Sequence, residues 1–427
     1  MSEPSGDDLT GPLGRPAPTP ERPAGTRVVL DARPLQEPDR APTTAAYLDG
    51  LLGAFDADPL EGESFALFLQ SDLDDPTERF RRLDVVGRRL LPPTRLLRSG
   101  AMTVDPFVLR GASLGAAWRA DRSGAAGAVY HAAGGGTLPL ASGLPIVVTL
   151  LDLAPWELPG AFQRTVVTRF GQRLRGRLIR DARAVIVGSD ATAALARRLL
   201  HLRRDRLRVI PFAPRPGFRA DRGQGAVERD RLGLPERYLI YTGRYDARQD
   251  LATLLRAIAL LAADGRPAGL DEDVPWPPRV LLVGASPDDR AALARAAARE
   301  DVGEALAYAP RLPDDRLAAL VGGARAALLP VLSEAAGLAA LEALACGTPV
   351  VASAVGALPE LVGAAGILVE PRDPRRLAVA LRAVWVDELV HGRVAGLARE
   401  RAAAQARTWA DVADETRRVY AEVGAAP

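Results

Sequence analysis

Two glutamates flank a predicted turn in the last third of the chain, and their positions suit the binding of a phosphorylated sugar. Glu334 follows an apolar strand, and Glu342 lies in a helix predicted over residues 338–345. Gly337 stands between them and lets the backbone approach a ligand. The amides of the first helical turn, from Leu338 onward, have no partner within the helix and favour a phosphate.

The two carboxylates are predicted to act on different parts of such a ligand. Glu342, one to two turns into the helix, can accept hydrogen bonds from a pair of vicinal hydroxyls such as those of a ribose. Glu334, before the turn, lies on the opposite side of the phosphate and can hold hydroxyls of a second sugar. The alternative interpretation is an exposed loop acid at Glu334 and a solvated helix position at Glu342.

The sequence around these glutamates closely resembles the donor-binding segment of the family 4 retaining glycosyltransferases, also called glycosyl transferases group 1. The two glutamates are separated by seven residues, and the stretches Cys346 to Ser353, Leu358-Pro359-Glu360 and 365–371 follow. The resemblance implies that Glu334 contacts the donor sugar and that Glu342 contacts the nucleotide ribose. It implies an α/β chain of GT-B fold, with two Rossmann-like domains facing each other across a cleft.

A second resemblance to the family concerns the leaving diphosphate. The predicted strand 237–243 ends in a glycine followed by Arg244, where the family has an arginine and, five residues later, a lysine that neutralise the diphosphate. Gln249 occupies the lysine position, and the chain contains no lysine at all. Arg248 is therefore the candidate for the second cation, because arginine is long and always charged.

The first half of the chain matches the family at fewer positions. Thr149 and Asp152 fit a strand that ends in Thr-x-His-Asp, but Leu151 occupies the histidine position. Asp152 is predicted either to approach the donor sugar or to cap the following helix. His131 precedes a glycine-rich loop at a strand end, which makes it either an acceptor-side residue or a structural histidine.

These residues predict a glycosyltransferase that moves a sugar from a UDP- or GDP-sugar to a hydroxyl of a glycan or lipid-linked acceptor, as in polysaccharide biosynthesis. The catalytic candidates are Glu334, Asp152 and Arg244. The donor-binding candidates are Arg244, Arg248, Gln249, Gly337, Leu338 and Glu342. The departures at Leu151 and Gln249 leave an alternative open, a catalytically silent GT-B protein that binds a nucleotide sugar or a partner glycosyltransferase.

The segment from Arg164 to Arg183 predicts a basic amphipathic helix. Its apolar residues recur at helical spacing, with arginines around them. Such a helix can lie on an anionic membrane and bring the protein to a lipid-linked acceptor. The alternative is a solvated helix packed on its own sheet.

Length and composition predict two α/β domains. With 427 residues and 48% hydrophobic content, the chain can form two separate cores. We expect a disordered tail (1–25), an N-terminal acceptor domain (26–214), a linker (215–236) and a nucleotide-sugar domain (237–386). A C-terminal helix within 387–427 is expected to return to the first domain.

Other composition features argue against several classes of function. The net charge of +2 is too small for bulk nucleic-acid binding. One cysteine and three scattered histidines predict neither a disulfide nor a metal site, so we expect no metal and no cofactor. No apolar run is long enough to span a bilayer, so we expect a cytoplasmic location, with peripheral contact at the inner membrane face as a further hypothesis.

Overall fold

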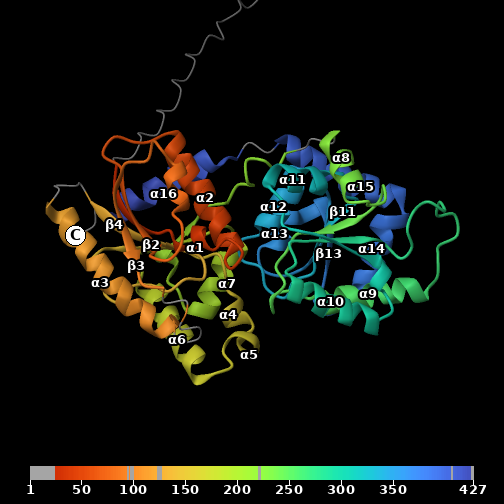
Figure 1. Cartoon of the computed structure of the whole chain (residues 1–427), viewed down its shortest axis with the longest axis horizontal. Helices are drawn as coiled ribbons and strands as arrows, with labels where there is room; N and C mark the ends of the chain where they lie inside the picture. The colour runs from red at the N-terminus through yellow and green to blue at the C-terminus, as the bar shows by residue number, and fades with distance from the viewer. Residues whose placement is uncertain are drawn as a thin grey trace, which may run out of the picture.

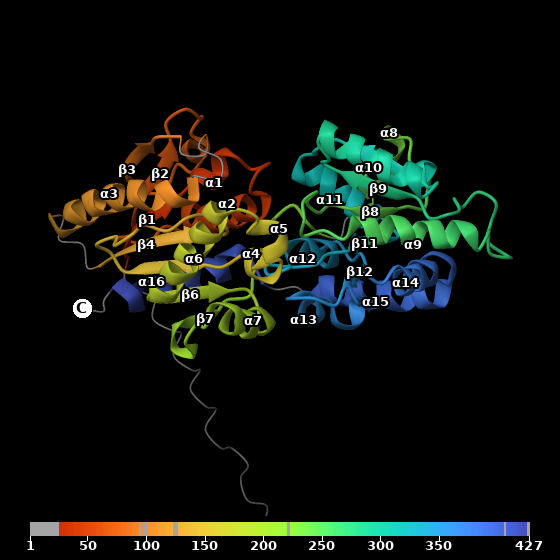
Figure 2. The ribbon, with the colours of Figure 1, turned by 90° about the horizontal axis from the view of Figure 1, so that it is seen from below.

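The computed structural model describes residues 25–93, 96, 101–122, 127–219, 223–404 and 407–424. These residues form two parallel sheets, one of seven strands in the order β3-β2-β1-β4-β5-β6-β7 and one of six in the order β10-β9-β8-β11-β12-β13. The sheets lie in two neighbouring lobes, each flanked by helices (Figures 1 and 2). The predicted arrangement of two Rossmann-like domains is confirmed.

Strands and helices alternate along most of the chain, as a parallel sheet requires. The strands are β1 (Arg27–Asp31), β2 (Ser64–Gln70), β3 (Val85–Leu91), β4 (Ala128–Ala133), β5 (Ile146–Thr149), β6 (Ala184–Val187), β7 (Leu207–Val209), β8 (Leu239–Tyr241), β9 (Val280–Val283), β10 (Leu306–Ala309), β11 (Ala326–Leu329), β12 (Val350–Ser353) and β13 (Gly366–Val369). The helices are α1 (Arg33–Gln36), α2 (Pro42–Ala57), α3 (Ala101–Arg122), α4 (Ala154–Glu157), α5 (Pro159–Phe162), α6 (Val166–Asp181), α7 (Asp190–Leu200), α8 (Gly223–Arg231), α9 (Leu251–Ala263), α10 (Pro287–Arg299), α11 (Asp314–Gly323), α12 (Leu338–Ala345), α13 (Leu358–Val362), α14 (Pro374–Val386), α15 (Glu388–Ala404) and α16 (Trp409–Gly424).

The central strands are buried on both faces, which explains their uninterrupted apolar sequences. In β1, Val28 and Leu30 pack in the core beneath α2 and α16, whereas Val29 packs in the core on the opposite face, beneath α3, α6 and α7. The second sheet has a core on each face in the same way. Each sheet therefore exposes its carboxyl-terminal loops as the place for a ligand.

The edge strand β3 was absent from the sequence prediction, in which the residues from Leu90 to Gly100 were a connection. Most side chains of β3 are exposed and two are arginines, Arg88 and Arg89. An edge strand buries little apolar surface, so its sequence lacks the pattern that identified the inner strands.

The end of the chain contains two helices, α15 and α16, where the sequence predicts one C-terminal helix within 387–427. Helix α15 packs on α12 and α14 in the second domain, whereas α16 packs on α2 and β4 in the first (Figure 1). Arg417 in α16 makes a buried ion pair with Glu63. The exact domain boundaries stay a prediction, and the expected tail lies outside the described residues except for Gly25.

The expected linker over 215–236 contains helix α8, which was not predicted. Helix α8 packs so closely on α11 that Gly225 leaves no room for a side chain. An added Cβ there would lie 2.8 Å from the Ala319 carbonyl oxygen and 3.3 Å from Gly323 Cα. Glu228 in α8 also pairs with Arg316 in α11. Helix α8 thus packs on the second domain, Phe218 is buried in a core of the same domain, and the interdomain connection after β7 lies at Pro214 and Arg215.

Candidate functional site

The two loops that carry most of the predicted site residues follow neighbouring strands of the second sheet. Strand β8 has β9 on one side and β11 on the other, which is the switch point where ligands of open α/β sheets bind. The loops after β8 and β11 are joined by a bridge between Gln249 and Val331 and by the bond from Asp250 N to Pro330 O, 2.8 Å. Their side chains therefore project into a common region.

Glu334 holds the turn between β11 and α12. Its Oε1 accepts hydrogen bonds from the amides of Ala336, at 3.1 Å, and Gly337, at 2.8 Å. Burial raises the pKa of Glu334, and these two hydrogen bonds oppose that rise. Part of the predicted anion site is thus occupied by the glutamate itself.

Gly337 is required by its conformation as well as by its surroundings. Its φ of 67° lies in the left-handed region, and an added Cβ would come within 2.1 Å of Leu361 Cδ1. Leu338, the first residue of α12, is buried, and its side chain packs in the core cluster of the first domain. The N-terminus of α12 therefore lies directly at the interface between the domains.

Glu342 is buried in α12 and paired with an arginine that the sequence analysis did not identify. Arg215 Nε donates to Glu342 Oε1 at 2.5 Å, and Arg215 Nη2 donates to Glu342 Oε2 at 2.9 Å. Burial raises the pKa of Glu342, and the charge and hydrogen bonds of Arg215 oppose the rise. The interpretation of Glu342 as a solvated helix position is therefore wrong.

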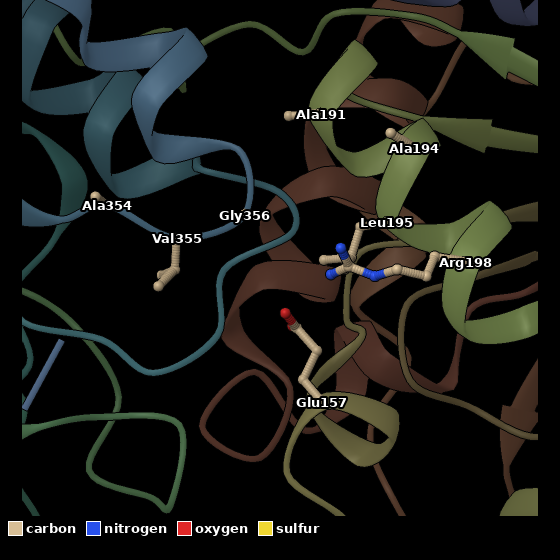
Figure 3. A pocket seen from close by; sticks show the side chains of 8 residues that line it. All are labelled: Glu157, Ala191, Ala194, Leu195, Arg198, Ala354, Val355 and Gly356. Carbon is tan, nitrogen blue, oxygen red and sulfur yellow. The ribbon is translucent and has the colours of Figure 1, made fainter. Parts of the chain in front are cut away.

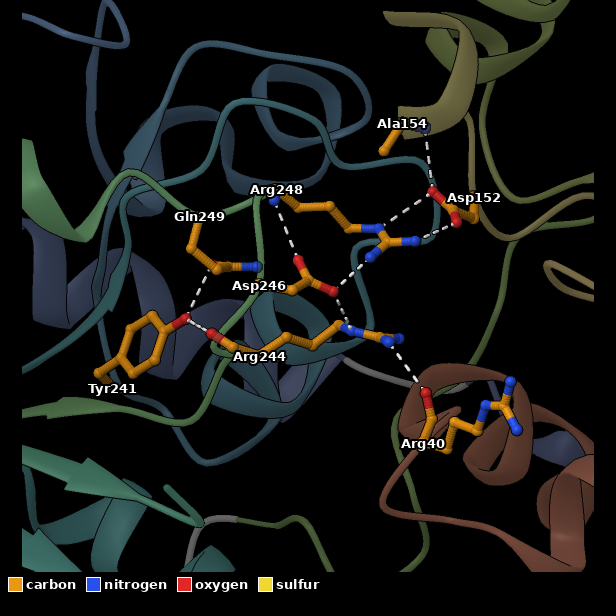
Figure 4. Close-up of polar contacts among 8 residues, drawn as sticks. All are labelled: Arg40, Asp152, Ala154, Tyr241, Arg244, Asp246, Arg248 and Gln249. Atoms are coloured by element: carbon orange, nitrogen blue, oxygen red, sulfur yellow. Dashed lines mark hydrogen bonds and ion pairs between the residues drawn. The ribbon is translucent and has the colours of Figure 1, made fainter. Parts of the chain in front are cut away.

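Two arginines and two aspartates form a charged cluster at the domain interface (Figure 4). Asp246 accepts from Arg244 Nε at 3.0 Å and also pairs with Arg248. Arg244 reaches across to the first domain and donates to the backbone carbonyl of Arg40 at 3.0 Å. Gln249 accepts from the Tyr241 hydroxyl at 2.8 Å, which fixes its side chain beside the cluster.

Asp152 completes this cluster from the first domain. Its carboxylate accepts from Arg248 at 2.5 and 3.2 Å and from the amide of Ala154 at 2.9 Å (Figure 4). Burial alone would raise the pKa of Asp152, but the hydrogen bonds and charge of Arg248, aided by buried Arg175, bring it below its ordinary value. Asp152 thus accepts from the first amide of α4, whose N-cap is Leu153, and contacts the loop that follows β8.

His131 does not line the acceptor side, and the prediction of an acceptor contact is replaced by its structural alternative. The side chain is fully buried, Nε2 lies 2.9 Å from the Thr149 hydroxyl and Nδ1 lies 2.6 Å from the Tyr420 hydroxyl. Burial lowers the pKa of His131 to about 3, so it stays neutral. Leu151, at the position where the resembled family has a histidine, is also buried in the first core.

Helix α6 is only partly the solvated basic helix that its sequence suggested. Arg175 is buried, with Nη2 bonded to the Gly134 carbonyl at 3.0 Å and the guanidinium over the Trp156 ring. In contrast, Val166 and Phe170 are exposed although they are apolar. The predicted helix is present, but one of its arginines, Arg175, lies on the buried face and not among the solvated arginines.

A cavity of about 360 Å³ lies between the domains beside the Glu334 turn. Helix α7 forms one wall, Glu157 from α4 another, and the loop 354–356 closes the far side, while Glu157 and Arg198 point into it (Figure 3). Glu157 also hydrogen-bonds to Ser333, the neighbour of Glu334. Burial raises the pKa of Glu157 despite that bond.

Five residues of this interface were not identified as site residues from the sequence: Asp246, Arg215, Arg175, Glu157 and Arg198. Asp246 had a usable signal, because it stands between two arginines in the loop after a predicted strand. The others lie in the linker or in first-domain helices, far from the glutamate motif in sequence. Nothing in their local sequence indicates that they lie at this interface.

The comparisons with known proteins agree with this architecture. Residues 236–387 match the family described as Glycosyl transferases group 1. The chain is similar to D-inositol 3-phosphate glycosyltransferases, with 37% identity over 230 residues for the Streptomyces griseus protein (51% of this chain, 46% of that one). For the Acidothermus cellulolyticus protein the identity is 33% over 274 residues (59% and 58%). The chain thus spans about half the length of the curated relatives it matches.

Solved structures of the GT-B fold align over nearly the whole chain. Sucrose-phosphate synthase from Thermosynechococcus elongatus superposes with a TM-score of 0.67 at 21% identity, covering 93% of this chain and 98% of that one. Anabaena HepE in complex with UDP and glucose gives 0.65 at 17% identity, covering 93% and 100%. The chain therefore has the GT-B fold, and its residues 236–387 match the glycosyl transferases group 1 family.

Proposed function

We propose that the protein is a retaining glycosyltransferase that transfers a sugar from a nucleoside diphosphate donor, UDP-linked in the first instance, to an acceptor hydroxyl. The observation that carries this proposal is the meeting of Arg244, Arg248, Asp152 and the Glu334 turn at the switch point of the second sheet. Its relatives are named as glycosyltransferases, and HepE, a neighbour in fold, binds UDP and glucose.

In the proposed reaction, the bond between the anomeric carbon and the phosphate oxygen breaks while a bond to the acceptor oxygen forms. The departing diphosphate gains negative charge, which Arg244, Arg248 and the amides at the start of α12 stabilise. Its oxygen becomes basic and takes the acceptor proton. The sugar ring, which carries positive charge at that moment, lies between Glu334 and Asp152.

Donor binding in this proposal changes the partners of Arg248. In the structure, the Arg248 guanidinium is paired with Asp152 and Asp246, and Asp246 also pairs with Arg244. Two carboxylates therefore neutralise the arginines that are proposed to bind the diphosphate. The diphosphate takes the place of the Asp152 carboxylate on Arg248. Asp152 then turns toward the donor sugar.

For the acceptor we propose the cavity lined by Glu157 and Arg198, in place of His131. The cavity adjoins the Glu334 turn through Ser333. The Glu157 carboxylate can accept a hydrogen bond from a sugar or cyclitol hydroxyl, and Arg198 can bind a phosphate. The acceptor is expected to be a glycan or lipid-linked sugar. Inositol 3-phosphate is a necessary member of the test panel because the curated relatives are named for it.

We further propose that the exposed side of α6 meets an anionic membrane surface. Arg169, Arg173 and Arg177 are exposed there, and so are the apolar side chains of Val167 and Phe170. Such a mixture suits peripheral binding. Among the described residues, no helix is long and apolar enough to cross a bilayer.

A specific observation favours a second candidate, a protein that binds nucleotide sugars without turning them over. Leu151 is buried where the family has a catalytic-site histidine, and Gln249 holds Tyr241 where the family has a lysine. Each departure removes one group that would stabilise the transition state.

A donor panel separates the two candidates. Purified protein is incubated with UDP-, GDP- and ADP-sugars, with and without acceptors, and nucleoside diphosphate release and the anomeric configuration of the product are measured. Our proposal predicts release with at least one donor and a product that keeps the donor's configuration. Tight nucleotide binding without release from any donor would establish the silent alternative instead.

A further inference from the structure

The residue Arg215 occupies the junction between the two domains. It follows Pro214, whose carbonyl oxygen accepts from Trp409 Nε1 at 3.0 Å where the returning chain crosses to α16. From this anchored backbone the Arg215 side chain extends into the second domain. It is therefore fixed at one end by the first domain and at the other by α12.

The Arg215 guanidinium is fully engaged with groups of the second domain. Two nitrogens bind the two oxygens of Glu342, Nη1 pairs with Asp314, and the guanidinium plane lies 4.5 Å from the centre of the Phe218 ring. The side chain of Glu342 is only 8% exposed, and that of Arg215 is 21% exposed. Such a bidentate pair has strong directional preference and holds the carboxylate in one orientation.

A carboxylate bound in this way keeps lone pairs for other donors. Each carboxylate has about four lone-pair sites, and the bidentate arginine uses two of them. The remaining sites can accept from the vicinal hydroxyls of a ribose, as the proposed function requires of Glu342. Without Arg215, the buried carboxylate would lose both its orientation and its nearest positive charge.

We propose that Arg215 is a positioning residue that presents the charged Glu342 carboxylate to the ribose of the donor nucleotide and ties this contact to the interdomain connection. The inference rests on the proposed function, because it takes the nucleotide ribose as the ligand of Glu342. It adds a residue outside the family's glutamate motif to the donor site.

The charged surroundings of Glu342 make this role measurable through pH. Arg215 from the connection and Asp314 from α11 are the described charges that act on it, and the thiol of Cys346, with a pKa raised by burial to about 12, is neutral. Helices α13 and α15 and strands β11 and β12 also pack on α12, and none of the charges that act on Glu342 comes from them. Removal of Arg215 therefore raises the pKa of Glu342 further, and the carboxylate protonates at a higher pH.

The test is calorimetric titration of the full chain with UDP from about pH 8 to about pH 6 for wild type, Arg215→Gln and Arg215→Lys. We expect Arg215→Gln to bind UDP about tenfold more weakly near the lower pH, with a steeper loss of affinity as pH falls than in wild type. Arg215→Lys keeps the positive charge and is expected to restore the wild-type pH profile. Arg316→Gln, which removes an arginine–glutamate pair of α11 outside the site, is the matched control and is expected to bind like wild type.

Two outcomes would overturn the inference. The first is unchanged UDP binding in Arg215→Gln. The second is a loss of UDP affinity that is equal in both Arg215 variants and independent of pH, as expected if Arg215 only stabilises the fold. Circular dichroism and the melting temperature of each variant confirm that it is folded before titration. Glu342→Gln is titrated in parallel. Unchanged UDP binding in that variant would contradict the ribose contact of the proposed function. If Glu342→Gln binds UDP more weakly than wild type but Arg215→Gln binds it equally well, this inference alone is contradicted.

Discussion

The second domain supplies its site residues from two adjacent loops, whereas the first domain supplies them from separate elements. Arg244, Arg248, Glu334 and Glu342 all come from the segments that follow β8 and β11, which are hydrogen-bonded neighbours. The first domain contributes Asp152 after β5, a backbone carbonyl before α2, and buried Arg175 from α6. The candidate site is thus built from adjacent loops in one domain and assembled by tertiary packing in the other.

This difference predicts that the domains respond differently to the same kind of substitution. A change in a second-domain loop is expected to act on the ligand directly, because the side chain faces the proposed diphosphate or ribose. A change at a buried first-domain residue is expected to act on folding first. The following experiments test that contrast, beginning with the largest expected effect.

Replacement of Arg244 by alanine is expected to give the largest loss of activity. It removes a cation beside the departing diphosphate, which lowers turnover by about a hundredfold. Steady-state rates of nucleoside diphosphate release measure the effect. Arg256→Ala on the surface of α9 is the matched control, since Arg256 pairs only loosely with Glu300, at 3.6 Å. Equal turnover in wild type and Arg244→Ala would remove Arg244 from the proposed site.

The buried imidazole of His131 is expected to affect stability and not activity. Its pKa is about 3 in the folded chain and about 6.5 when unfolded, so acid protonates the unfolded state first. Between about pH 7 and about pH 4.5 this difference lowers the free energy of unfolding by about 2–3 kcal/mol. His131→Gln is expected to lose that part of the pH dependence in denaturant titrations, while the KM for acceptor stays unchanged. A raised acceptor KM would restore the acceptor-side interpretation.

Replacement of Glu342 by alanine is expected to weaken nucleotide binding by about tenfold, because a charged hydrogen-bond acceptor for the ribose is lost. Titration with UDP measures the change, and Glu304→Ala, an exposed acid before β10, serves as control. A deoxyribose analogue of UDP is expected to bind wild type and Glu342→Ala with similar affinity. If Glu342→Ala still binds UDP more tightly than the deoxyribose analogue, as wild type is expected to do, the ribose hydroxyls contact another residue.

The smallest expected effect concerns the exposed side of α6. Replacement of Arg173 by glutamine is expected to reduce binding to vesicles containing anionic lipid by about fivefold, because one positive charge is lost. Sedimentation with vesicles measures the bound fraction, and Arg393→Gln on α15, which removes one positive charge elsewhere on the surface, is the control. Unchanged binding of the α6 variant would show that this helix is simply a solvated surface.

The sequence predicted much of the second domain because its evidence is local. Helix α12 begins and ends at the predicted residues, and Glu334, Gly337 and Glu342 lie at one turn as expected. Their partners were not predictable in this way. Arg215 meets Glu342 across 127 positions of the sequence, and Arg248 meets Asp152 across 96.

The first domain shows why periodicity and residue type can mislead. Arg175 is charged and was grouped with the solvated arginines, but the Trp156 ring and the Gly134 carbonyl provide a buried site for its guanidinium. His131 stands at a strand end that leads toward the cleft, but its side chain points back to Tyr420 of the final helix. Tyr420 is nearly three hundred residues away in sequence, so no local pattern could indicate this partner.

Hydrogen–deuterium exchange with and without UDP or its sugar conjugate tests the central claim most directly, because it locates the nucleotide on the chain. The account predicts slower exchange in peptides that cover residues 243–250 and 333–342, and no change in peptides of α6 or around His131. Protection confined to the first domain, or no protection of the two second-domain loops at a saturating nucleotide concentration, would contradict it.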